Sequence, residues 1–176
     1  MLNTKYIIRN GGDGNLVATQ NPSRLGAAWL VNSTILVDNA DDEMTQLSSF
    51  NPADEVLVDK RFSVEEQAFD GSGSISLSAY KPNHLTYDVN SSEEAFAVFS
   101  EIYYATGWNA YVDGELNDHY RVNYVLRGMP LPKGKYQVEF KFEPTSVAIG
   151  SSIALVCSIL IYLLIGFVGF KTFRKS

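Results

Sequence analysis

An uncharged hydrophobic stretch runs from Val147 to Phe170, near the C-terminal end of the chain. A helix of these 24 residues spans about 36 Å, which exceeds the roughly 30 Å hydrocarbon core of a bilayer. A segment in lipid must satisfy its own backbone hydrogen bonds, and a helix does so. The pattern therefore predicts a transmembrane helix over residues 147–170, with the lipid bilayer as its partner.

Alternating hydrophobic and polar positions dominate the segment before this stretch. From Tyr136 to Phe142 every second residue is hydrophobic, which is typical of a strand with one buried face. Asp113 and Gly114 form a dipeptide that favours a tight hairpin turn. Similar strand patterns cover residues 75–79, 85–89, 95–101, 108–112 and 124–129. Together they predict a small antiparallel β-sandwich over residues 70–144.

Residues 1–69 mix strand patterns with one short helical pattern. Asp38 or Asn39 is placed to cap a helix whose first turn, residues 41–43, is entirely acidic, as the helix dipole favours. The predicted apolar face of this helix consists of Ala40, Met44 and Leu47. Strand patterns before and after the helix predict a strand, helix, strand module over residues 33–59.

The DGSGS run over residues 70–74 is the most flexible composition in the chain and the best internal boundary. The predicted fold class is mainly β with a small α/β N-terminal module, followed by an antiparallel β-sandwich and one C-terminal transmembrane helix. The predicted units are the mixed module in residues 1–69, the sandwich in residues 70–144, the helix over residues 147–170 and a basic cytoplasmic tail in residues 171–176.

The basic residues beyond the helix predict its orientation. Lys171, Arg174 and Lys175 follow it, and cytoplasmic flanks of membrane helices carry an excess of Lys and Arg. Residues 1–146 are then extracytoplasmic at the cell (inner) membrane, and they contain 11 basic and 20 acidic residues. A domain of this charge should not bind nucleic acid. The single cysteine, Cys157, lies in the helix, so the outer domain has no disulfide.

The residues after Met1 form a strand pattern without an export signal. We therefore expect the chain to be the C-terminal piece of a longer polytopic protein, whose upstream transmembrane helices deliver this domain outward. The alternative is a tail-anchored protein with a cytoplasmic domain, which would place the basic tail on the wrong side. Gly150, Ala154 and Ser158 recur at every fourth position and favour packing against other helices. The alternative is a lone anchor.

Candidate catalytic residues are scarce. His84 and His119 are isolated. Asp118 and His119, beside Asp113 and Glu115, could form a metal or acid-base cluster, but we expect a solvated turn there. The Glu65-Glu66 and Glu93-Glu94 pairs are adjacent, so their carboxylates point to opposite sides of a strand. The chain contains no nucleophile elbow, phosphate-binding loop or zinc spacing, and the NGGDGN run around Asp13 lacks the ligand spacing of a calcium loop. We expect no catalytic residue, no metal site and no cofactor.

One stretch has the composition of a sugar-binding site. It contains Glu101, Tyr103, Tyr104, Trp108, Asn109 and Tyr111. Aromatic faces beside short polar side chains suit the C–H faces and hydroxyl groups of a sugar. The alternative interpretation is that Trp108 and one tyrosine fill the core of the sandwich.

Several long segments are similar to a known family. They are RLGAAWLV (residues 24–31), SAYKPNHLTYDV (78–89), VFSEIYYATGWNAYVDG (98–114), RVNYVLRGMPLP (121–132) and YQVEFKFEP (136–144). In these segments the chain resembles the YfhO family of bacterial multi-pass membrane proteins, thought to be glycosyltransferase-like. The resemblance implies an extracytoplasmic domain and last transmembrane helix, with the catalytic acidic residues in an N-terminal membrane region outside this chain.

The resemblance and the topology lead to a hypothesis about function. The chain would be a non-catalytic extracytoplasmic module of a polytopic glycosyltransferase-like protein that acts on cell-envelope or lipid-linked glycans. The alternative is a structural or partner-docking membrane-anchored β domain without a glycan role.

Overall fold

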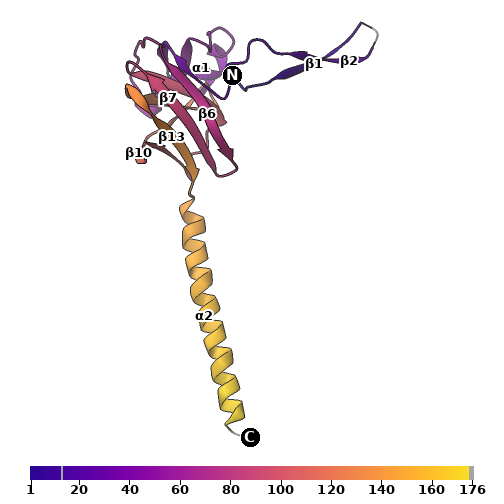
Figure 1. Cartoon of the computed structure of the whole chain (residues 1–176), viewed down its shortest axis with the longest axis vertical. Helices are drawn as coiled ribbons and strands as arrows, with labels where there is room; N and C mark the ends of the chain where they lie inside the picture. Colours follow the sequence, from indigo (N-terminus) through magenta and orange to yellow (C-terminus); the bar gives the residue numbers. More distant parts are fainter. Residues whose placement is uncertain (13, 175–176) are drawn as a thin grey trace.

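The computed structural model describes residues 1–12 and 14–174 of the chain. Asp13 of the NGGDGN run and Lys175 of the basic tail lie outside the described residues. A β-sandwich stands at one end of a long helix, α2 (Thr145–Phe173), and a two-stranded hairpin projects sideways from the sandwich (Figure 1). The hairpin consists of β1 (Tyr6–Asn10) and β2 (Leu16–Gln20). The protein is thus mostly β with one long C-terminal helix, as the sequence predicts.

The first sheet of the sandwich has five antiparallel strands. In spatial order they are β10 (Glu115–Asn117), β9 (Trp108–Val112), β13 (Gly134–Phe142), β7 (His84–Ser91) and β6 (Ser74–Lys81). The predicted alternation in β13 is confirmed, since Val138 and Phe140 are buried and the residues between and beside them are more exposed. The predicted hairpin is confirmed too: Asp113 and Gly114 connect β9 to β10 with φ angles of 46° and 87°, as a tight primed turn requires.

The second sheet has six strands. In spatial order they are β3 (Ala28–Val31), β8 (Ala95–Ile102), β12 (Leu126–Leu131), β11 (Tyr120–Val122), β5 (Glu55–Asp59) and β4 (Ser33–Val37). Its pairs are antiparallel except β4 with β5, which are parallel and joined through α1 (Ala40–Gln46). The predicted strand, helix, strand module is therefore present. Strands from both sides of residues 70–74 share this sheet.

The two sheets enclose one core, and the six-stranded sheet buries a second core on its other face. The first core contains Tyr87, Phe99 and Phe140, whose rings meet edge to face with centroids 4.8 to 6.2 Å apart. The second contains Trp29 and Phe96 and is covered partly by the segment after β5, which includes η1 (Lys60–Phe62). Strand β8 contributes to both cores, which explains why its sequence is apolar at consecutive positions.

Helix α1 begins as predicted, but its buried face differs from the prediction. The Asn39 side chain caps it by accepting hydrogen bonds from the N–H groups of Asp41 and Asp42 at 2.9 and 3.0 Å. Met44, predicted on the apolar face, is 48 % exposed, whereas Glu43 is fully buried. The physical reason is that β11 and the turn after it supply polar partners for the Glu43 carboxylate.

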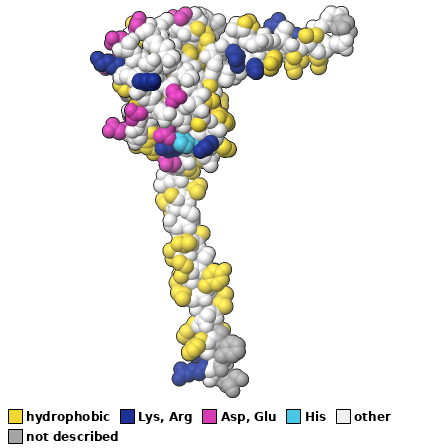
Figure 2. Space-filling view, viewed as in Figure 1, with side chains coloured by type: hydrophobic (Ala, Val, Ile, Leu, Met, Phe, Trp, Pro, Cys, Tyr) yellow, Lys and Arg dark blue, Asp and Glu magenta, His cyan; other side chains and the backbone are white. Residues whose placement is uncertain are grey.

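Helix α2 (Thr145–Phe173) follows β13 after two residues. Its 29 residues span about 43 Å, close to the 40–45 Å of a bilayer with its headgroups. Within the described residues it is the one helix long and apolar enough to cross a membrane, and no part of it is buried against the sandwich. Hydrophobic side chains cover its surface, and basic side chains lie near its far end (Figure 2).

Candidate functional site

The stretch from Glu101 to Tyr111 lies at the end of the sandwich from which α2 leaves, which we name the helix-proximal end. Trp108 is paired with Phe142, the last residue of β13. The N–H of Glu143 donates to the carbonyl of Gly107 at 2.6 Å. Gly107 has a φ of 114°, and a Cβ there would lie 2.9 Å from the Phe142 ring, so only glycine fits. These contacts bring the aromatic stretch beside the start of α2.

Trp108 and Glu101 are directed toward the interior of the sandwich, where both lie near Arg127. The Arg127 guanidinium carbon lies 4.3 Å from the centroid of a Trp108 ring and 5.1 Å from that of Phe140, within cation–π range. Its Nε donates to the carbonyl of Ile102 at 3.0 Å. Arg127 is 2 % exposed, and within residues 1–12 and 14–174 it forms no salt bridge.

Burial shifts both charged groups of this interior pair toward neutrality. Burial raises the pKa of Glu101, and the Arg127 charge only partly opposes this. Burial lowers the pKa of Arg127, again opposed by Glu101. Both directions follow from desolvation, which disfavours the charged form. The attraction between these residues does not compensate for their removal from water.

Asn109 and Tyr111 lie on the opposite, outer face of β9. The Asn109 Nδ2 and the Tyr111 hydroxyl donate to the same Glu143 carboxylate oxygen at 3.0 and 2.7 Å. Both bonds lower the pKa of Glu143, and the bond to Glu143 raises the pKa of Tyr111. The Lys141 ammonium lies 4.8 Å from the centroid of the Tyr111 ring. These side chains form a polar surface patch beside the start of α2.

The two adjacent tyrosines have different environments. Tyr103 packs against Phe62 and His119, with ring centroids 6.2 and 5.5 Å apart. Tyr104 is 55 % exposed. The structure thus divides the six residues of the predicted sugar site among the sandwich interior, the outer face of β9 and the connecting loop, all at the helix-proximal end.

His119 belongs to the interior, although the sequence predicted a solvated turn. Its ring lies between Tyr103 and Phe140, with centroid distances of 5.5 and 5.4 Å. Burial and the nearby Arg127 lower its pKa to about 4, so the ring is neutral at pH 7. Its Nε2, the Tyr87 hydroxyl and the Arg127 Nη1 are buried and have no partner among the described residues. All three side chains contact the Phe140 ring.

Two cavities flank this region. The smaller, about 190 Å³, is lined by Trp108, Asn109, Ala110, Leu116, Asn117, Asp118 and His119, and we name it the Trp108 hollow. The larger, about 480 Å³, adjoins it at Asn117 and extends to Ala95 and Leu131 at the other end of β8. It brings together Glu65 and Glu94, which belong to two separate carboxylate pairs in the sequence. No group of three His, Cys, Asp or Glu side chains that could hold a metal occurs among the described residues.

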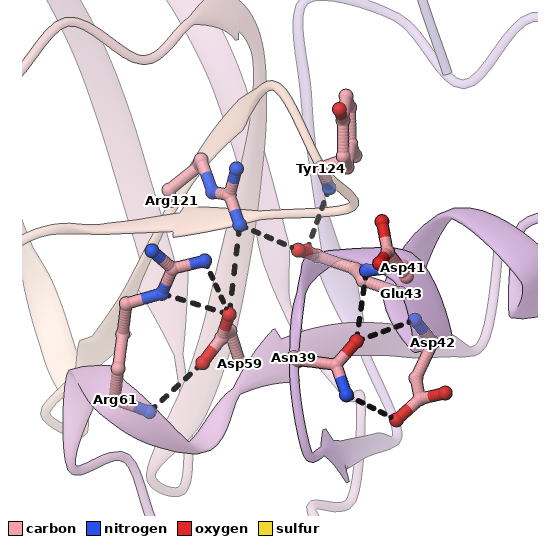
Figure 3. Close-up of polar contacts among 8 residues, drawn as sticks. All are labelled: Asn39, Asp41, Asp42, Glu43, Asp59, Arg61, Arg121 and Tyr124. Carbon is pink, nitrogen blue, oxygen red and sulfur yellow. Dashed lines mark hydrogen bonds and ion pairs between the residues drawn. The ribbon is translucent and has the colours of Figure 1, made fainter.

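A second cluster of buried polar side chains, the Glu43–Arg121–Asp59 network, lies under α1 (Figure 3). Arg121 Nη2 donates to Glu43 at 2.8 Å and lies 3.8 Å from Asp59, while the N–H of Tyr124 donates to the other Glu43 oxygen at 2.7 Å. Arg61 Nε donates to Asp59 at 2.8 Å. Burial raises the pKa of Glu43 despite these partners, and the Arg61 hydrogen bond lowers that of Asp59. This network ties α1 to β5 and β11.

The small-residue stripe of α2 is exposed over its whole length. A Cβ at Gly150 would meet no atom within 4 Å, and the Ser158 hydroxyl donates only to the Ala154 carbonyl of its own helix, at 2.8 Å. None of the described elements packs on this face. The packing role of Gly150, Ala154 and Ser158 remains a prediction.

These features describe a membrane protein in which a β-sandwich is joined directly to a long apolar helix. The sequence profile of the family described as "Bacterial membrane protein YfhO" matches residues 67–154, which is half of the chain. The chain belongs to the YfhO family of bacterial membrane proteins. The match covers β6 to β13 and the first residues of α2. No curated protein and no solved structure matches the chain.

Proposed function

We propose that this chain is an extracytoplasmic, non-catalytic module of a polytopic glycosyltransferase-like membrane protein, and that it handles a lipid-linked or cell-envelope glycan. Membership of the YfhO family supports the membrane setting. The observation that carries the proposal is the position of the aromatic stretch at the helix-proximal end, where Trp108 pairs with the last residue of β13. A sugar attached to a membrane lipid would meet these side chains at the bilayer surface.

The proposed topology places α2 across the cell membrane, with the sandwich outside and Lys171 and Arg174 inside. A protease added outside intact cells, after permeabilisation of an outer membrane where one exists, should then cut the connection between η1 and β6 near residues 70–74. The C-terminal tail should stay intact. Protection of this linker, together with cleavage of the tail from outside, would overturn the topology.

The glycan role is tested with the full chain in lipid nanodiscs. Polyprenyl-phosphate sugars and envelope glycan fragments are titrated, and saturable binding should weaken with Tyr104→Ala. Tyr6→Ala is a matched control, because Tyr6 is 54 % exposed, close to the 55 % of Tyr104, but lies on the projecting hairpin. Absence of binding to every glycan, or equal loss with both substitutions, would contradict the proposal.

The alternative function is that of a structural or partner-docking domain, and the hairpin favours it. Strands β1 and β2 present Tyr6, Ile8 and Leu16 to solvent, each more than half exposed. A two-stranded hairpin is marginally stable alone, and exposed apolar groups often mark contact surfaces. If Ile8→Ser lowers the level of the full-length parent protein while glycan binding is absent, this second function is the better account.

A further inference from the structure

We propose that the Trp108 hollow binds one uncharged sugar ring, the ring nearest the lipid in a lipid-linked glycan. This inference rests on the proposed function and assigns it to a particular site. The residues that carry it are Trp108, Asn117, Asp118 and His119, of which the sequence-based sugar site contained only Trp108.

The size of the hollow limits what it can hold. Its volume is about 190 Å³. Pockets for drug-sized ligands begin at about 300 Å³, so a disaccharide would extend out of this hollow. A single sugar ring with its hydroxyl groups fits the available space.

The lining has both kinds of group that a sugar needs. Trp108 is half-buried and packs against the sandwich core, so it is held as a rigid aromatic wall for the C–H groups of a ring. Asn117 and Asp118 come from the end of β10 and the connection to β11, and both are exposed. The amide oxygen of Asn117 and the Asp118 carboxylate accept hydrogen bonds from hydroxyl groups. The lining thus combines an aromatic side chain with hydrogen-bond acceptors, the two kinds of group that recognise a sugar.

The charges around the hollow disfavour an anionic ligand. His119 is neutral at pH 7, because burial holds its pKa at about 4. Arg127 is buried and stacks on the Trp108 ring at 4.3 Å, and it does not line the hollow. Asp118 is the one acidic residue in the lining. A phosphate would therefore meet a carboxylate without a facing cation, whereas an uncharged ring meets no such repulsion.

The height of the hollow above the membrane identifies which sugar it would meet. Trp108 is paired with Phe142, three residues before Thr145, the first residue of α2. At about 3.3 Å per residue this places Trp108 at most about 10 Å above the helix start. Helix α2 is long enough to cross the headgroups as well as the hydrocarbon core. The lipid phosphate would then lie at headgroup level and the first sugar at the hollow.

The larger cavity serves as the built-in comparison. It is lined by Glu65, Gln67 and Glu94, among others, and none of these three lines the Trp108 hollow. Substitutions of these residues therefore separate the two sites. Asn117 lines both cavities, so Asp118 is the selective position.

The experiment measures binding of methyl α-glucoside, methyl N-acetyl-β-glucosaminide and glucose 1-phosphate to the full chain in nanodiscs. The expected result is saturable binding of at least one uncharged glycoside, which Asp118→Ala weakens about tenfold, as loss of one hydrogen bond of this kind would. Glu94→Ala and Gln67→Ala should leave it unchanged. Far-ultraviolet circular dichroism establishes that each variant is folded, and Asp118→Asn, which keeps an acceptor oxygen, should restore part of the affinity.

Each other outcome overturns the inference in a distinguishable way. Loss of binding with Glu94→Ala but not with Asp118→Ala would move the sugar to the larger cavity. Tighter binding of glucose 1-phosphate than of the methyl glucosides would show an anion site. If polyprenyl-phosphate sugars bind but Asp118→Ala has no effect, the hollow is not the site and the proposed function stands. If neither the glycosides nor the lipid-linked sugars bind, the proposed function fails as well.

Discussion

Arg121 and Arg127 lie directly opposite each other in the β11–β12 ladder, but their surroundings differ. Arg121 turns to α1 and forms salt bridges with Glu43 and Asp59 at 2.8 and 3.8 Å. Arg127 turns to the five-stranded sheet and stacks on Trp108, without a salt bridge among the described residues. Each guanidinium also has one buried nitrogen without a hydrogen-bond partner among the described residues.

The comparison distinguishes a structural charge from a charge that the fold does not require. A buried ion pair is costly to break, because removal of one partner leaves the other charged and desolvated. Glu43 has no exposure, so it depends on Arg121. Glu101 is only half-buried and responds to loss of Arg127 by binding a proton more readily. Stability should therefore depend on Arg121 and much less on Arg127, and the substitutions Arg121→Met and Arg127→Met test this difference.

The largest effect is expected for Arg121→Met, which keeps most of the side-chain volume but removes the charge. Glu43 would remain buried without its ion-pair partner, so the free energy of unfolding should fall by about 3–5 kcal/mol. Urea unfolding of the full chain in nanodiscs, followed by tryptophan fluorescence, measures this. Glu43→Gln with Arg121→Met in one chain should recover part of the loss. An effect below about 1 kcal/mol would show that the network is not structural.

The second effect is a pH dependence from His119. Its pKa is about 4 in the folded chain against about 6.5 when unfolded, so the unfolded chain binds the proton first. Above about pH 6.5 the titration of His119 does not lower the stability of the fold. As the pH falls from about 6.5 to 4, the free energy of unfolding decreases by about 3 kcal/mol in total. Glu43 and Glu101 have raised pKa values and act in the opposite direction.

His119→Phe isolates the histidine contribution, since it retains a ring between Tyr103 and Phe140. The stability difference between the wild type and this variant should change between pH 6.5 and pH 4 and stay constant above pH 7. Denaturant unfolding at a series of pH values gives this difference. A difference that does not vary with pH would mean that the imidazole is solvated, and would contradict its placement in the interior.

Local features of the fold follow from the sequence because their causes lie within a few residues. The Asn39 cap, the Asp113-Gly114 turn and the alternation in β13 depend on neighbouring side chains and backbone angles. The apolar helix depends only on its own composition. Each of these was predicted with nearly correct bounds.

Features that depend on distant partners did not follow from the sequence. The buried state of Glu43 requires Arg121, and the alternation pattern contains no information on which strand faces α1. The sequence predicted a solvated turn for His119 because Asp113, Glu115 and Asp118 are its neighbours in the chain, whereas Phe140 and Tyr103 enclose its ring in the fold. The antiparallel pairing of β3 with β8 joins segments on both sides of residues 70–74. Sequence alone reached the stretch around Trp108 but not the hollow that its neighbours form.

The third prediction concerns how α1 presents Glu43. Asn39→Ala removes the side-chain acceptor for the N–H groups of Asp41 and Asp42 and should cost about 1 kcal/mol. Thr45→Ala is the control, since the Thr45 hydroxyl donates to the Asp41 carbonyl on the exposed face of the same helix. It should change stability by less than about 0.5 kcal/mol. If the two substitutions have equal effects, the cap does not position the helix.

The smallest effect is expected for Arg127→Met. The substitution removes a hydrogen bond to the Ile102 carbonyl, worth about 1 kcal/mol, and the stacking on Trp108. It also removes the cost of keeping a guanidinium buried without an ion pair. This gain offsets the lost hydrogen bond and stacking, so the free energy of unfolding should change by about 1 kcal/mol or less. Trp108 emission should shift, because the Arg127 guanidinium that stacks on its ring is lost. If Arg127→Met instead destabilises the chain as much as Arg121→Met does, then the attraction between Arg127 and Glu101 acts as a structural ion pair. A double-mutant cycle with Glu101→Gln would then give a coupling energy of more than about 1 kcal/mol, and the distinction between the two arginines would fail.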